Sequence, residues 1–160
     1  MAAKNKKEGL TVDKIYKTIL LVITTVFIIA LVLVIFKPFG YNNLDSLKEI
    51  EASEILSQVP DNNSQYFVFI YEEGMDESEM VAEKIVEYAK YANNNKDAKQ
   101  IYVVKKTTEN VNTILSYLSA SFDKTNGFPC LLTISSGSVS QTKSTVSTIN
   151  TAIDTEMSNK

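Results

Sequence analysis

The sequence predicts an α/β fold, a three-layer sandwich with a mixed central sheet, preceded by one transmembrane helix. Three observations lead to this prediction. Residues 18–36 contain no charged side chain. Residues 66–71 form an aromatic and β-branched run without polar alternation, typical of a central strand covered on both faces. Strand-like and helix-like segments then alternate toward the C-terminus, which favours a sheet packed between helices.

The apolar segment 18–36 has the length of a membrane-spanning helix. At about 1.5 Å per residue it would extend roughly 28 Å, close to the thickness of the hydrocarbon core of a bilayer. Lys17 and Lys37 give it polar ends, and Pro38 and Gly40 are expected to stop the helix.

The charges around this segment predict its orientation. Residues 1–17 contain five lysines against Glu8 and Asp13, and such a basic flank stays in the cytoplasm. We therefore expect a single-pass protein of the plasma membrane with residues 41–160 outside. A cleaved signal peptide is the alternative, but its apolar core would be shorter, and residues 36–39 offer no small-residue cleavage site. An uncleaved signal anchor is the favoured reading.

The composition of residues 41–160 excludes several classes of function. This part carries 10 Lys and 17 acidic residues, and the whole chain has no Arg and no His. An acidic exterior without Arg argues against binding nucleic acid or anionic lipid. The absence of His removes the commonest general base and metal ligand. One cysteine allows no internal disulfide. We expect no cofactor and no metal, and partners that are other membrane or envelope proteins.

These observations divide the chain into five parts. They are a cytoplasmic tail (1–17), a transmembrane helix (18–37), a tether (38–46), an extracytoplasmic domain (47–157) and a C-terminal tail (158–160).

The domain is expected to begin with a short edge strand at 47–50 and a short helix at 53–58. Ile55, Leu56 and Val59 would face inward from this helix. A turn at 60–64 then leads into the central strand 66–71.

A polar loop, 72–77, precedes a helix of about 15 residues whose apolar positions recur at helical spacing. These positions are Val81, Ile85, Tyr88, Ala89 and Ala92. A second strand follows at 101–104. Thr108 is expected to cap the next helix, although the full capping box is missing.

Gly127, Phe128 and Pro129 introduce a strand at 130–134, and residues 135–138 turn it into an antiparallel hairpin. The last helix would bury Val146, Ile149, Ile153 and Met157. Two strand–helix–strand units in this order imply right-handed crossovers and a sheet covered on both faces.

Across roughly residues 47–157 this pattern resembles the thioredoxin-like superfamily, here as a membrane-anchored bacterial member. The resemblance rests on the strand 66–71, the loop into a long helix, and Gly127-Phe128-Pro129 before a strand and a Gly-containing hairpin. In that family the proline is cis and packs beside the helix N-terminus, where a Cys-x-x-Cys pair performs dithiol chemistry. Pro129 matches that proline.

The chain departs from the family at the cysteine pair. Alignment from Tyr71 places the two cysteines on Met75 and Ser78, with Asp76 and Glu77 between them. Because dithiol exchange needs an attacking thiolate and a resolving partner, the sequence excludes a Cys-x-x-Cys oxidoreductase. We expect a protein that is not an enzyme and has no catalytic residue.

The acidic segment 72–79 has three readings. A helix N-terminus favours carboxylates, so the segment is first a well-solvated helix start. It is alternatively an acidic recognition surface or a loose Ca²⁺ site, although it has the glycine of a Ca²⁺ loop without the alternating ligands.

Cys130 has two readings. It is a small buried residue at the start of a core strand, or the thiol of a single-thiol oxidoreductase. Nearby carboxylates would raise its pKa and make it less reactive.

The resemblance implies that an extended peptide binds beside the proline and the helix start. The expected binding surface consists of Met75, Asp76, Glu77, Ser78, Phe128 and Pro129. The predicted function is that of a redox-inactive, protein-binding or accessory component of a transport, secretion or envelope complex. The alternatives are an oxidoreductase working through Cys130 and a purely structural spacer.

Overall fold

The computed structural model describes residues 12–35, 43–59, 65–124 and 126–158. The chain divides into two compact units, Met1–Phe39 and Gly40–Lys160. Lys37, Pro38 and the predicted turn at 60–64 lie outside the described residues.

The first unit contains the helix α1, Val12–Ile35. Its described side chains, 14–28, are exposed on every side and are mostly apolar. The hydroxyls of Thr18, Thr24 and Thr25 each donate to the carbonyl four residues earlier, at 2.8 Å, so the helix satisfies them internally. Among the residues that the structure describes, no helix combines the length and the apolar character needed to cross a membrane. The transmembrane helix therefore stays a prediction.

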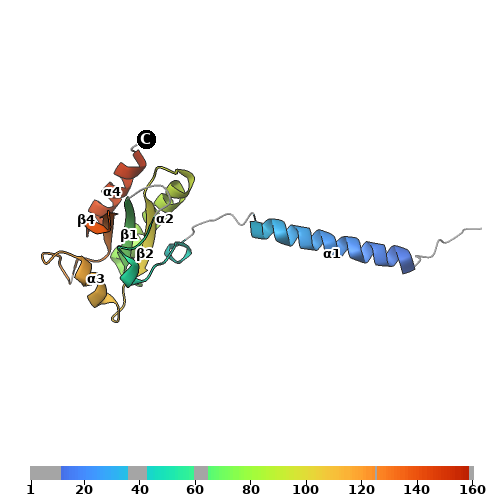
Figure 1. The fold of residues 1–160 in the computed structure, drawn as a ribbon, viewed down its shortest axis with the longest axis horizontal. Coiled ribbons are helices and arrows are strands. Elements are labelled where there is room, and N and C mark those ends of the chain that lie inside the picture. The colour runs from blue at the N-terminus through green and yellow to red at the C-terminus, as the bar shows by residue number, and fades with distance from the viewer. Residues whose placement is uncertain (1–11, 36–42, 60–64, 125, 159–160) are drawn as a thin grey trace, which may run out of the picture. The chain divides into compact units, whose positions relative to one another are not determined.

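The second unit is built on a four-stranded mixed sheet (Figure 1), which confirms the predicted sheet type. Its strands are β1 (Gln65–Tyr71), β2 (Gln100–Lys105), β3 (Cys130–Ser135) and β4 (Ser138–Lys143). Their order is β2-β1-β3-β4. β1 is parallel to β2 and antiparallel to β3, and β3 and β4 form the expected antiparallel hairpin.

Helices cover both faces of this sheet, as Figure 1 shows. They are α2 (Asp76–Asn94), α3 (Val111–Tyr117) and α4 (Val146–Ser158). Alternate residues of β1 point to opposite sides. Phe67 and Phe69 pack with α2 and α4, whereas Val68 and Ile70 pack with α3. Because β1 is buried on both sides, its sequence lacks polar alternation.

The segment before β1 is less regular than the sequence predicts. Residues 47–50 form a single parallel bridge, Glu49 with Val103, instead of a strand. The predicted helix at 53–58 is reduced to the 3₁₀ turn η2, Ala52–Glu54. Ile55 is fully buried as expected, but Val59 is 87% exposed, so the prediction for Val59 was wrong. Its inward placement assumed a helical spacing that this segment does not have.

Upstream of that segment, the 3₁₀ turn η1 (Leu44–Ser46) already belongs to the folded unit. Leu44 and Leu47 are buried in the cluster under α2 and α4. The side chain of Asn43 accepts from Ser46 N at 3.1 Å and caps this turn.

Two further predictions need correction. The helix α3 starts at Val111, after Asn110, and Thr108 does not cap it. Instead, Thr107 N donates to Asn110 Oδ1 at 2.8 Å, and Asn110 N donates to Thr107 Oγ1 at 3.3 Å. The β2–α3–β3 connection is not a parallel crossover, because β3 runs against β1 while β2 runs with it.

Candidate functional site

The predicted binding residues gather at one edge of the sheet. Because β1 and β2 are parallel, their carboxyl ends, Tyr71 and Lys105, lie at the same edge and pair in register. The N-terminus of α2 follows β1 after a short loop, and Phe128 and Pro129 lead into β3, whose first residue Cys130 pairs with Ile70. The topology therefore brings positions 72–79, 105–106 and 127–130 together.

The start of α2 is fixed by Met75 and Ser78. The carbonyl of Met75 accepts from Ser78 N at 2.9 Å and from Glu79 N at 3.1 Å. Ser78 is 2% exposed, and its hydroxyl accepts from Glu72 N at 3.3 Å. Met75 is half-buried against the apolar cluster that includes Phe128 and Cys130. The two positions that the resemblance assigns to cysteines thus hold a thioether in the rim of the site and a buried hydroxyl.

Two lysines neutralise part of the acidic segment. Lys106 Nζ lies 2.6 Å from Glu72 Oε2, and Lys105 pairs with Glu73. The hydrogen bond to Glu73 raises the pKa of the Lys105 ammonium. Sequence reasoning missed both pairs: it interpreted the segment as a solvated helix start, with an acidic recognition surface or a Ca²⁺ site as alternatives, and gave its carboxylates no ion-pair partner. The available signal was the doublet Lys105-Lys106 at the carboxyl end of β2, the strand that is parallel to β1.

The remaining carboxylates of this segment face solvent. Asp76, Glu77 and Glu79 lie in the first turn of α2 and are exposed. None of the three has an ion-pair partner within the described residues. We call these three residues the α2 acidic turn.

Aromatic packing closes the floor of the site. Phe128 is 3% exposed, and its ring lies edge-on to Phe122 with centroids 5.3 Å apart. The ammonium of Lys106 lies 4.8 Å from the Phe128 ring centre. The Phe128–Pro129 peptide bond is cis, as the resemblance implies, and Pro129 is buried.

Cys130 is a fully buried residue at the start of β3, which confirms the first reading of this position. Burial raises the pKa of its thiol. The expected direction was correct, but the cause is desolvation and not the nearby carboxylates. A protonated, inaccessible thiol is a poor nucleophile.

The six predicted surface residues therefore occupy one edge but differ in accessibility. Asp76 and Glu77 are exposed and Met75 is half-buried, whereas Ser78, Phe128 and Pro129 are buried. Only the exposed and half-buried members are accessible to another molecule. Within the described ranges, no group of three His, Cys, Asp or Glu side chains is arranged to hold a metal ion.

Comparison with known proteins gives the fold. No family model and no curated protein sequence matches the chain. Among solved structures it is similar to a complex of ferredoxin:thioredoxin reductase and thioredoxin f2. The similarity has a TM-score of 0.52 at 10% identity and covers 71% of this chain and 94% of that one. The fold is thioredoxin-like. Chlamydomonas reinhardtii thioredoxin f2 is a second similar structure, with a TM-score of 0.47 at 11% identity, covering 71% of this chain and 99% of that one.

The thioredoxin-like fold and the single cysteine agree with the sequence resemblance. The chain has one cysteine, so the Cys-x-x-Cys pair is absent. A dithiol mechanism through this motif is excluded on that ground alone.

Proposed function

We propose that this protein is a membrane-tethered, redox-inactive, thioredoxin-like protein that binds another membrane or envelope protein. It would serve as an accessory component of a transport, secretion or envelope complex. The domain has the edge at which β1 and β2 end and α2 begins, but Met75 and Ser78 occupy the positions that the resemblance assigns to cysteines.

The α2 acidic turn is the observation that carries the proposal. Glu72 and Glu73 are paired with Lys106 and Lys105, whereas the α2 acidic turn stays exposed. The half-buried thioether of Met75 adjoins it. An adaptable apolar group beside unpaired carboxylates suits a protein segment with a basic residue next to an apolar one.

The apolar helix α1 supports the tethered form of the proposal. Its large apolar side chains are exposed, and its threonine hydroxyls are satisfied by its own backbone. Lipid would cover such a surface, and the basic residues of 1–17 favour a cytoplasmic N-terminus.

Cross-linking on intact membranes tests the binding role. We expect Asp76→Asn combined with Glu77→Gln to reduce recovery of cross-linked partners by about tenfold, since rim charges contribute to encounter and to specificity. Asp97→Asn combined with Glu54→Gln is the matched control, because both residues are exposed, both lie before the amino ends of the parallel strands and outside α2, and the charge change is identical. Equal partner recovery from both variants would remove this surface from the function.

Membrane attachment is tested separately. The full chain is expected to resist alkaline extraction from membranes, and external protease is expected to digest residues 41–160 in intact cells. Release into the alkaline supernatant, or complete protection of the domain from external protease, would contradict the tethered arrangement.

A further inference from the structure

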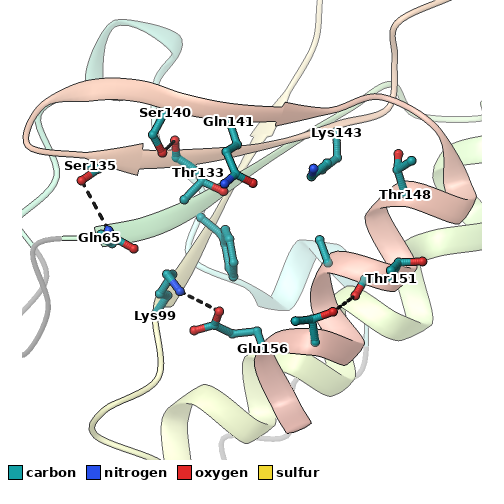
Figure 2. A pocket seen from close by; sticks show the side chains of 13 residues that line it. Gln65, Lys99, Thr133, Ser135, Ser140, Gln141, Lys143, Thr148, Thr151 and Glu156 are labelled. Carbon is teal, nitrogen blue, oxygen red and sulfur yellow. Dashed lines mark hydrogen bonds and ion pairs between the residues drawn. The ribbon is translucent and has the colours of Figure 1, made fainter. Parts of the chain in front are cut away.

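A cavity separate from the candidate site lies on the face of the sheet that α2 and α4 cover. It occupies about 550 Å³ between the β3–β4 hairpin and α4, within the range of small-molecule sites. Figure 2 shows the strand side chains above it and those of α4 below. Its lining includes Gln65 at the amino end of β1, whereas the candidate site lies at the carboxyl end of β1.

The strand wall of this cavity offers uncommitted hydrogen-bonding groups. Thr133, Gln141 and Lys143 have side chains that point into it (Figure 2). Within the part of the chain that the structure describes, these three side chains have no hydrogen-bond or ion-pair partner. Lys143 is half-buried and supplies a positive charge, and no described carboxylate lies within ion-pair distance of it.

The helix wall offers acceptors. The hydroxyls of Thr151 and Thr155 donate to the carbonyls of Ser147 and Thr151, each at 2.8 Å. Their protons are therefore committed, and their lone pairs remain available to a ligand. Glu156 accepts from Lys99 through Oε2 at 2.6 Å, and a carboxylate can accept further hydrogen bonds.

The charges are separated along the cavity. Lys143 and Thr148 both line the cavity, and Thr148 lies in the first turn of α4, where the helix dipole also favours an anion. The Lys99–Glu156 pair, which balances its own charge, lies toward the other end (Figure 2). Phe67 and Ala152 add an apolar surface to the lining. A complementary ligand has one anionic group at the first end and donor hydroxyls at the second.

We propose that this cavity binds a hydroxyl-rich carboxylate of monosaccharide size, a sugar acid. Its carboxylate would accept hydrogen bonds from Lys143 and Gln141. Its hydroxyls would donate to Thr151, Thr155 and Glu156, and its ring carbons would cover Phe67 and Ala152. The cavity is independent of the α2 acidic turn, so this inference does not rest on the proposed protein-binding function.

Calorimetric titration of the full chain in detergent micelles tests the proposal. Three probes are used separately at millimolar concentration: glucuronate, glucose and acetate. We expect glucuronate to bind at least about tenfold more tightly than the other two, because only glucuronate satisfies both ends of the cavity. Lys143→Gln should weaken glucuronate binding about tenfold. Lys124→Gln removes an exposed charge outside the cavity and should leave binding unchanged.

The outcomes separate the proposal from its alternatives. No binding of glucuronate by the unmodified chain overturns it. Equal affinity for glucuronate and acetate would show a general anion site and also overturns it, as does an equal effect of the two lysine substitutions. A circular dichroism spectrum identical to that of the unmodified chain confirms that the Lys143→Gln variant is folded.

Discussion

Lys106 Nζ lies 2.6 Å from Glu72 Oε2, although 34 residues separate them in the sequence. The same ammonium lies 4.8 Å from the centre of the Phe128 ring. One side chain therefore joins the loop after β1, the end of β2 and the loop before β3. The two contacts of Lys106 therefore link the segments at the edge of the sheet where α2 and its acidic turn begin.

Lys106→Met is expected to lower the free energy of unfolding by about 1 kcal/mol. The substitution removes a partly exposed ion pair and a cation–π contact while keeping an apolar stem of similar length. Urea titration of the full chain in micelles, followed by circular dichroism, measures it. Lys124→Met changes an exposed lysine and should alter stability by no more than about 0.5 kcal/mol. Equal losses in the two variants would show that the contact does not stabilise the fold.

Cys130 is expected to resist thiol reagents in the native chain at neutral pH. It is fully buried, and burial raises the pKa of its thiol, so little thiolate is present and reagent cannot reach it. Labelling should be at least about a hundredfold slower than in urea-unfolded chain, because exposing a core strand costs several kcal/mol. Mass spectrometry of timed samples measures both rates. Fast labelling of the native chain would instead support the alternative function, an oxidoreductase that works through Cys130.

Stability is expected to fall under alkaline conditions. Burial raises the pKa of the Cys130 thiol and of the Tyr88 hydroxyl, which is fully buried and donates to Lys99 O at 2.8 Å. The unfolded chain releases these protons at lower pH than the folded chain does. The stabilisation is therefore complete below the unfolded pKa values of about 9 and 10 and is lost as pH rises above them.

Each of these groups should contribute a slope of about 1.4 kcal/mol per pH unit once it ionises in the unfolded chain. Urea titrations at a series of pH values from neutral to alkaline give the slope. Cys130→Ala and Tyr88→Phe should each make it shallower. The same slope in all three chains would contradict the assignment.

The sequence was most informative where burial alone determines the residue types. The run 66–71 is apolar because helices cover both faces of β1, and its central position was confirmed. The stripe of α2 was predicted for the same reason, with Val81, Ile85 and Tyr88 fully buried. The apolar run of β1 and the apolar stripe of α2 depend only on which faces are buried, so they can be recognised without knowing which residues pack against them.

Features that depend on register were not predictable. The Glu72–Lys106 pair follows from the parallel alignment of Tyr71 with Lys105, which one-dimensional patterns do not specify. The cavity beside Lys143 depends on how α4 packs against the hairpin. Thr108 was chosen as a cap from residue type, but the neighbouring Thr107 and Asn110 satisfy each other's backbone amides.

Gly127→Ala is expected to destabilise the domain by about 1–3 kcal/mol, the usual cost of overpacking. A Cβ atom there would lie 2.3 Å from Asp123 O and 2.4 Å from Phe122 Cζ, and the backbone carbonyl cannot move aside as a flexible side chain could. Gly74→Asn is the contrasting variant, because Gly74 has φ +75° with open space around it, and Asn tolerates this conformation. Urea titration should show a clearly larger loss at 127 than at 74. The reverse order would mean that the loop before Phe128 relaxes, and that close packing at Gly127 does not hold the aromatic floor of the site.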